Sequence, residues 1–207
     1  MSTTDTGRDS HGPVGMIWAQ DRRGVLGARG AMLWRVPADF RHFRAATTGC
    51  GVVMGHTTWT SLAGVLKGRR NVVLSRRLTQ APEGALLANS LPEALGLAAQ
   101  ELDEDPRDGD LERSWPRLWI IGGGQVYAQA MEAGLAQTLV ITTVDTDAAR
   151  GTPSHPGPTA PEHLVLAPAI DPVAWTSDPA RSDPPGSWRE RSGDAAWRVD
   201  TWVRRCR

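Results

Sequence analysis

The segment 117–127, RLWIIGGGQVY, is the most informative stretch of this sequence. An apolar run typical of a buried strand leads into three successive glycines, and a helix-forming segment follows. Glycines at such a junction let the backbone come close to a phosphate group at the N-terminal end of a helix. The spacing is not the GxGxxG fingerprint of dinucleotide-binding folds, so on its own the segment also fits a plain strand-to-helix turn.

Outward from this segment, apolar runs and helical segments alternate along the chain. Pro37 is favoured at the first position of a helix, and Asp39 then falls in the first turn. The predicted strands cover 14–20, 51–54, 71–75, 138–146 and 195–205, and the other predicted helices cover 55–64, ended by Gly64, and 91–100. Strands that alternate with helices, followed by late strands without helices, predict an α/β fold with a mainly parallel sheet and an antiparallel edge.

Charge and cysteine content exclude several classes of function. The 207 residues carry 23 basic and 23 acidic side chains, so the formal net charge is zero. This balance argues against a nucleic-acid or anionic-membrane partner, which requires a surplus of basic residues. We find neither the apolar core of a signal peptide nor the roughly 20 apolar residues of a membrane span. Cys50 and Cys206 are too few for a disulfide framework or a metal cluster, so we expect free thiols in a reducing cytoplasm and no bound metal.

The length predicts a single domain over 14–207, preceded by a disordered polar tail at 1–13. Long loops near 100–115 and 148–190 account for the surplus length. The segment 101–112 has seven acidic residues against one arginine and no aromatic residue, which predicts a solvated loop.

Two further segments interrupt the alternation. The segment 21–33 contains three spaced glycines and is long enough to be a functional loop rather than a tight connection. Within the later proline-rich region, the short apolar run 163–168, HLVLAP, predicts a strand.

Polar turns follow three of the predicted strands, at 55–58, 75–77 and 122–125. The carboxyl ends of parallel strands meet at one edge of a sheet, which is where open α/β sheets bind ligands. Three such turns favour an extended, phosphate-bearing ligand. The hydroxyls of Thr57 and Thr58 are also explained by simple helix capping.

Asp39 is the acid with the strongest chemical context. Asp39 and Phe43 are four residues apart and share one helix face, which Leu62 and Leu66 could meet from the other side. A carboxylate between apolar walls suits a planar heterocycle with adjacent N–H donors, and the walls would raise its pKa. Compensation of the helix dipole is the alternative explanation of this acid.

Arg69 and Arg70 precede the predicted strand 71–75. An exposed arginine pair is usually solvated. The alternative is that one guanidinium binds a substrate carboxylate through two parallel hydrogen bonds.

Six blocks of sequence, in this order and at this spacing, resemble the dihydrofolate reductase family, most closely its short-chain bacterial members. The blocks are VGMIWAQDRRGVLGARG, LWRVPADFRHFR, VVMGHTTWTSL, GRRNVVLSR, WIIGGGQVY and ITTVD. The resemblance covers 14–147 closely and the last strand loosely. It implies a three-layer α/β/α fold and the reduction of 7,8-dihydrofolate to 5,6,7,8-tetrahydrofolate by NADPH, with hydride transfer to pterin C6 and protonation of N5.

The resemblance also assigns residues to the substrate. Asp39 corresponds to the single acid of the pterin pocket, and Trp34 and Thr142 support it in catalysis. Arg69 corresponds to the residue that pairs with the α-carboxylate of the glutamate tail. Phe43, Leu62 and Leu66 are implied to line the pterin and benzoyl sites, and Ile17 and Ile121 to offer backbone carbonyls near the pterin. Trp18 is implied to lie on the pocket wall and Tyr127 near the nicotinamide.

A second set of residues is implied to bind NADPH, with the loop 21–33 closing over the nicotinamide and a cis peptide between Gly122 and Gly123. The set comprises Ala19, Leu26, Gly55, His56, Thr57, Thr58, Leu74, Ser75, Arg76, Gly122, Gly123, Gly124, Gln125 and Val126. The resemblance implies a monomer with a small-molecule substrate.

The sequence departs from the family pattern at two positions. Leu33 stands where proline is usual, which we expect to change loop kinetics, and His56 stands where arginine usually faces the cofactor 2′-phosphate. Two alternatives remain: a same-fold pyrimidine reductase of riboflavin synthesis, and a non-catalytic pterin- or nucleotide-binding paralogue. The WxxPxD pattern of Trp34, Pro37 and Asp39 disfavours the first, and only Leu33 and His56 favour the second.

Overall fold

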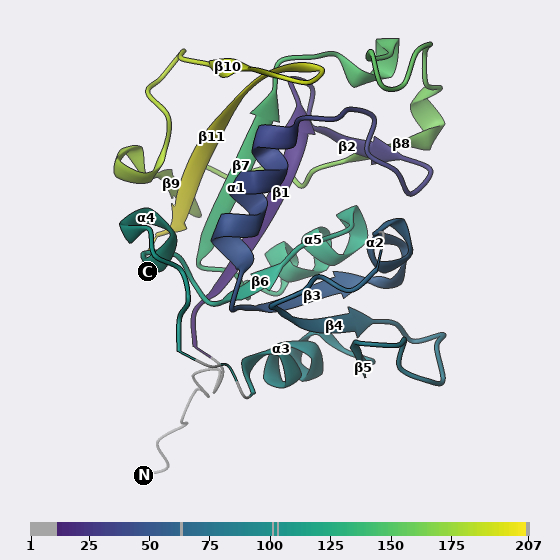
Figure 1. Cartoon of the computed structure of the whole chain (residues 1–207), viewed down its shortest axis with the longest axis vertical. Coiled ribbons are helices and arrows are strands. Elements are labelled where there is room, and N and C mark those ends of the chain that lie inside the picture. Colours follow the sequence, from purple (N-terminus) through teal and green to yellow (C-terminus); the bar gives the residue numbers. More distant parts are fainter. Residues whose placement is uncertain (1–11, 63, 101, 103, 206–207) are drawn as a thin grey trace.

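A computed structural model describes residues 12–205, apart from 63, 101 and 103. Within these residues, one sheet of nine strands has the order β10-β11-β7-β1-β6-β3-β4-β5, and β9 pairs with β11 (Figure 1). The strands are β1 Val14–Asp21, β2 Val25–Ala28, β3 Gly51–Gly55, β4 Arg70–Leu74, β5 Leu86–Ala88, β6 Leu118–Ile120, β7 Thr138–Val144, β8 Leu164–Leu166, β9 Trp175–Ser177, β10 Arg189–Ser192 and β11 Ala195–Arg204. The α-helices are α1 Pro37–Thr47, α2 His56–Ser61, α3 Leu91–Ala99, α4 Asp110–Arg113 and α5 Gly124–Glu132.

The predicted α/β class is confirmed, including the antiparallel edge. The pairs β1–β6, β1–β7, β3–β6, β3–β4 and β4–β5 are parallel, whereas β11 is antiparallel to β7, β9 and β10. Short apolar runs bounded by glycine form the central strands, as expected for strands that are buried on both faces.

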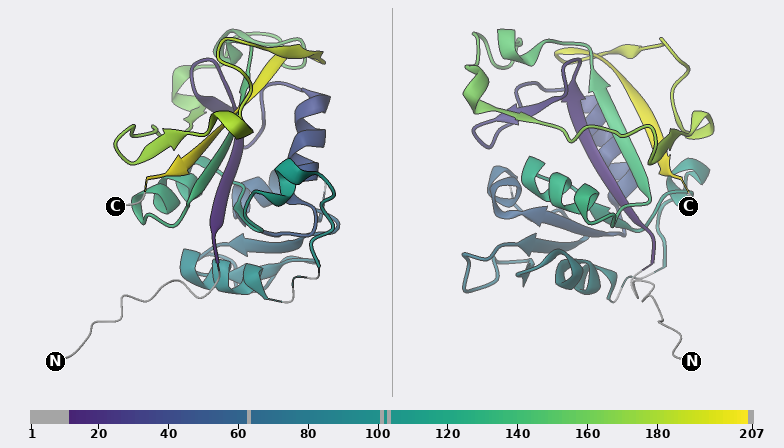
Figure 2. Two further views of the ribbon diagram at one scale, coloured as in Figure 1. Left: turned by 90° about the vertical axis from the view of Figure 1, so that its left-hand side faces the viewer. Right: turned by 180° about the vertical axis from the view of Figure 1, so that it is seen from behind.

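The period of two along each strand divides the core into two clusters, one on each face of the sheet. Ile17 and Val52 point to the face covered by α1 and α2, and their neighbours Met16 and Val53 point to the face covered by α3 and α5. Figure 2 shows α1 and α5 on opposite sides of β1 and β7. The molecule therefore has the three expected layers.

Several local predictions need correction. The helix expected over 55–64 ends at Ser61, because Leu62 takes an extended conformation and packs against the α1-side core. The segment 21–33 contains a strand, β2, which pairs with β8 in a separate two-stranded sheet. The strand expected in the run 163–168 is therefore present, outside the main sheet. Of the expected tail, 1–11 lies outside the described residues, as does Cys206.

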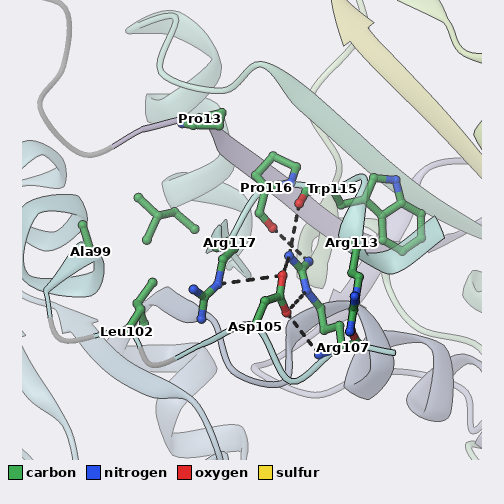
Figure 3. Close-up of a pocket in the computed structure, with 10 residues that line it drawn as sticks. Pro13, Ala99, Leu102, Asp105, Arg107, Arg113, Trp115, Pro116 and Arg117 are labelled. Carbon is green, nitrogen blue, oxygen red and sulfur yellow. Dashed lines mark hydrogen bonds and ion pairs between the residues drawn. The ribbon is translucent and has the colours of Figure 1, made fainter. Parts of the chain in front are cut away.

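The prediction that 101–112 is a solvated loop is wrong at its centre. Arg107 is only 4 % exposed. Its guanidinium binds both carboxylate oxygens of Asp105, at 2.8 and 2.6 Å, and donates to the backbone oxygens of Ala46, Trp115 and Pro116. Arg107 and Asp105 also line a cavity of about 310 Å³, together with Trp115 and Pro116 (Figure 3). The hydrogen bonds of Arg107 attach the loop to the end of α1 and to the residues just before β6.

Neither a membrane-spanning helix nor a metal-binding cluster is present in the described part of the chain. No helix there is long and apolar enough to cross a bilayer. No group of three or more His, Cys, Asp or Glu side chains is arranged to hold a metal ion. Cys50 is buried and free.

Candidate active site

The glycine turns at the ends of β3 and β6 lie in direct contact. The backbone N–H of Gly55 donates to the oxygen of Gly122 at 2.7 Å, and the peptide between Gly122 and Gly123 is cis. Leu74, the last residue of β4, pairs with Gly55, so Ser75 follows at the same edge. The three polar turns found in the sequence therefore come together.

These turns form a cradle that has no room for side chains. A Cβ at Gly55 would lie 3.0 Å from Val126 Cγ2, and one at Gly124 would lie 2.7 Å from Val165 Cγ1. Helix α5 begins at Gly124, and no side chain of the described residues caps its N-terminus. Helix α5 has nine residues, and its uncapped N-terminus beside a glycine turn suits a phosphate group.

The far end of the cradle is polar and open. His56 and Thr57 are exposed at the start of α2, with Thr58 and exposed Gln125 beside them. The Ser75 hydroxyl accepts hydrogen bonds from two backbone amides of the next turn, at 3.2 and 3.3 Å, and Arg76 is exposed. This edge can hold a polar or anionic group from the solvent side.

The segment 21–33 lies over the same cradle. Leu26 Cδ1 would be 3.8 Å from a Cβ at Gly124, and a Cβ at Gly30 would be 3.3 Å from Thr57 Cγ2. The carboxylate of Asp21, fully buried, accepts from the amides of Val25 and Ala148 and so fixes where this segment begins. Sequence reasoning missed Asp21, since an acid after a strand gives no sign of burial.

Asp39 lies on the α1 side of the sheet, at the predicted pocket. The hydroxyl of Thr142 on β7 donates to its carboxylate at 2.6 Å. Burial raises the pKa of Asp39 to about 6, although the Thr142 hydrogen bond and the positive charge of Arg189 both lower it. A carboxylate in this position exchanges protons near neutral pH and can accept two parallel N–H bonds.

Apolar walls surround this carboxylate. Trp34, Ile17 and Ile121 belong to the α1-side core, and Phe43, Leu62 and Leu66 pack against it. The indole nitrogen of Trp34 is buried without a partner among the described residues. Leu33 is also buried, and its backbone oxygen accepts from the Thr152 hydroxyl at 2.5 Å.

Trp18 and Tyr127 lie on the opposite face of the sheet, in the α5-side core. Their rings are 5.2 Å apart, and the Tyr127 hydroxyl donates to the backbone oxygen of Ile17 at 2.7 Å. Burial raises the pKa of Tyr127 well above its usual range. The two rings thus support the backbone of β1 from behind, and Ala19 is half-buried further along that strand.

The arginine pair separates into two roles. Arg69 lies 5.8 Å above the Phe43 ring and donates to the Thr47 hydroxyl, whereas Arg70 donates to Leu97 of α3. Burial and the charge of Arg44 lower the pKa of Arg69, so two cations stand where an anion would stabilise both.

Asn71 is a second residue that the sequence reasoning missed. Its buried side-chain amide donates to the backbone oxygens of Leu66 and Arg69, at 3.0 and 2.9 Å, and accepts from Leu66 N. It therefore fixes the backbone of two predicted substrate contacts. Asn71 stands beside Arg70 at the start of β4, where a polar residue gives no local sign of this role.

The dihydrofolate reductase family model matches residues 13–157. The chain belongs to the dihydrofolate reductase family. It is 39 % identical over 184 residues to a dihydrofolate reductase of Mycobacterium tuberculosis, a match that covers 87 % of this chain and 91 % of that protein. It is 43 % identical over 136 residues to that of Mycobacterium leprae, covering 64 % of this chain and 73 % of that protein.

The fold of this dihydrofolate reductase family member agrees with a solved structure. A dihydrofolate reductase from Enterococcus faecalis, complexed with NADP(H) and RAB-propyl, superposes with a TM-score of 0.69 at 23 % identity. The match covers 95 % of this chain and 98 % of that one.

Proposed function

We propose that this protein is a dihydrofolate reductase that reduces 7,8-dihydrofolate to 5,6,7,8-tetrahydrofolate with NADPH. The observation that carries the proposal is a buried carboxylate, Asp39, bonded to Thr142 on the α1 side of the sheet, in a chain of this family. The same observation argues against a pyrimidine reductase of riboflavin synthesis, which lacks the segment that carries Trp34, Pro37 and Asp39.

The glycine cradle fits the cofactor. The turn at Gly122–Gly124 and the neighbouring Gly55 have no side chains that would keep a diphosphate away from the backbone amides, and a Cβ at Gly55 or Gly124 would meet Val126 or Val165. His56, Ser75 and Arg76 would hold the adenosine 2′-phosphate at the open end. When bound, NADPH supplies the hydride that reduces the pterin at C6.

In the pterin pocket, Asp39 would accept hydrogen bonds from N3 and the 2-amino group and so orient the ring. Thr142 would hold the carboxylate, and the unpartnered Trp34 indole would bind an ordered water at the same end. Phe43, Leu62 and Leu66 would exclude bulk water, which strengthens each of these polar contacts.

At the mouth of the pocket, Arg69 would bind the α-carboxylate of the glutamate tail. Asn71 would act only through the backbone that carries Arg69 and Leu66. The pairing of β2 with β8 supports the idea that the segment 21–33 covers the nicotinamide.

The proposal includes three expectations about the protein as a whole. The enzyme would act as a monomer, in the cytoplasm, and as one domain over 14–207.

A spectrophotometric assay with dihydrofolate and NADPH tests the proposal. We expect NADPH oxidation that depends on dihydrofolate and is lost in Asp39→Asn, with circular dichroism unchanged. Binding of dihydrofolate without turnover in the unaltered protein would instead identify a non-catalytic paralogue.

A further inference from the structure

A partly exposed arginine stands behind the pterin pocket, on the antiparallel edge of the sheet. Arg189 of β10 pairs in register with Trp197 of β11, and its guanidinium carbon lies 4.5 Å from the centre of the Trp197 ring. Asp183 holds it there, because the Arg189 Nε donates to both oxygens of the Asp183 carboxylate, at 3.1 and 2.8 Å. The guanidinium is thus fixed in position on a buried ring.

The sheet register places this guanidinium near Asp39. Trp197 pairs with Val144 of β7, and Val199 pairs with Thr142, whose hydroxyl bonds to Asp39. Residues two apart on a strand share a face, so Trp197 and Val199 both lie on the α1 side. Both are buried there in the same core cluster as Trp34.

Helix α1 closes the arrangement from the other side. His42 lies one turn beyond Asp39, and its ring centroid is 6.0 Å from that of Trp197. The Ser192 hydroxyl, at the end of β10, accepts from the backbone amide of Ala38 at 3.0 Å. Strand β10 is therefore in direct contact with the first turn of the helix that carries Asp39.

We propose that Arg189 is a positioning residue for Asp39: held on Trp197 by Asp183, its guanidinium supplies the positive field that keeps the Asp39 carboxylate ionised in an apolar pocket. The groups that act on the Asp39 carboxylate are the Thr142 hydroxyl from β7 and the charge of Arg189 from β10, and His42 lies one turn along the same helix. Burial and the charge of Arg189 lower the pKa of His42 to about 4, against the opposing charge of Asp183, so His42 is neutral and leaves Arg189 as the cation on this side.

The charge of Arg189 has a clear direction of effect. It lowers the pKa of Asp39 and so opposes the larger effect of burial. Because the Arg189 side chain is 38 % exposed, solvent weakens its field but does not remove it. Asp183 fixes the guanidinium through its Nε, and the negative charge of Asp183 offsets part of the field of Arg189.

The test is the titration of Asp39 in the ligand-free protein, followed by the ¹³C shift of its carboxyl carbon and assigned with Asp39→Asn. In Arg189→Gln the midpoint should rise by up to about one unit, which is no more than the lower limit of the range for an opposite charge in close contact, because solvent and Asp183 weaken the field. Arg189→Lys should return it close to the original value. Arg191→Gln, an exposed arginine two residues along β10, is the matched control and should leave it unchanged.

Kinetics give a second readout that rests on the proposed function. The acidic limb of kcat/KM for dihydrofolate should move with the carboxyl midpoint in Arg189→Gln, with kcat/KM equal to that of the unaltered enzyme well above it. Arg189→Met keeps the packing on Trp197 without the charge and should behave like Arg189→Gln. The methionine variant therefore serves as the test if the glutamine variant does not fold.

An unchanged Asp39 midpoint in a folded Arg189→Gln or Arg189→Met protein would overturn the proposal. So would a uniform loss of kcat/KM at every pH, since that is the result expected if β10 only supports helix α1. If the chain did not reduce dihydrofolate, the carboxyl titration would still decide the role of Arg189, so the two failures are distinguishable.

Discussion

The buried carboxylate of Asp39 is suited to binding a ligand, but in its ionised form it lowers the stability of the fold. Burial raises the pKa of Asp39 to about 6, above the value of about 3.9 in an unfolded chain. The folded protein therefore binds this proton more tightly than the unfolded chain does. The stabilisation is complete below about pH 4 and is lost as the pH rises through about 6.

Replacing this carboxyl by an amide separates the two effects. We expect Asp39→Asn to remove dihydrofolate reduction and to raise the free energy of unfolding at about pH 8 by about 1–3 kcal/mol, because asparagine never ionises. Urea unfolding at about pH 5 and about pH 8 measures the difference, which should be smaller at the lower pH. A variant that is less stable than the unaltered protein at pH 8 would contradict the cause assigned here.

His56 is the second residue at which a single side chain should decide a property of the site. It is exposed at the start of α2, where it replaces the arginine usual in the family. Arginine carries a permanent charge and binds phosphate through two parallel hydrogen bonds, which a histidine cannot form. We therefore expect His56→Arg to raise the ratio of kcat/KM for NADPH to that for NADH.

The control for this effect is an uncharged side chain at the same place. In His56→Gln the ratio should not rise above that of the unaltered enzyme. A ratio that is unchanged in His56→Arg would show that Arg76 alone discriminates between the two cofactors.

At the scale of elements, the Arg107–Asp105 pair attaches the long loop after α3 to the rest of the fold. The hydrogen bond from Arg107 lowers the pKa of Asp105 to about 2, below its unfolded value. This pair therefore stabilises the fold above about pH 4 and stops doing so as the pH falls towards 2. Asp105→Asn should reduce the loss of stability over that acidic range, and Glu104→Gln, an exposed acid beside it, should not.

The other partner gives a larger effect. Arg107→Met leaves the Asp105 carboxylate and three backbone oxygens without their donor, and we expect a loss of about 2–4 kcal/mol at neutral pH. Chemical denaturation measures it. A change below about 0.5 kcal/mol, the usual size for surface substitutions, would show that the pair is not an anchor.

The same loop shows where sequence reasoning ends. The central strands and α1 were predictable, because their apolar periodicity, the glycines after the strands and Pro37 are local signals. The burial of Arg107 was not, since seven acids in twelve residues describe composition and say nothing of one side chain that reaches backbone oxygens elsewhere. The pairing of β2 with β8 joins segments about 140 residues apart, and no local pattern encodes it.

The candidate site divides in the same way. Asp39, the glycine turns and Arg69 stand in motifs and could be found by spacing. Asn71 and Arg189 could not be assigned a role, because their importance comes from what the folded chain brings to them. Trp18 illustrates a related point, since the alternation of β1 turns its ring to the face opposite Asp39.

At the scale of the whole molecule, both core clusters share the strands of one sheet. Trp119 belongs to the α1-side core and Trp18 to the α5-side core, although β1 and β6 are paired. Loss of either core would expose the other face of the same strands, so neither can unfold alone without a large cost in buried apolar surface. This is the physical basis for expecting one domain over 14–207.

We therefore expect a single unfolding transition, with equal midpoints by tryptophan fluorescence, far-UV and near-UV circular dichroism. Saturating NADPH should shift all three midpoints together, because a ligand that binds only the folded state stabilises every part that unfolds with its site. Sedimentation at several protein concentrations should give one mass, that of the monomer. Separate midpoints, or a transition of which NADPH shifts only one part, would mean that the two faces of the sheet fold as independent units and that the single-domain prediction is wrong.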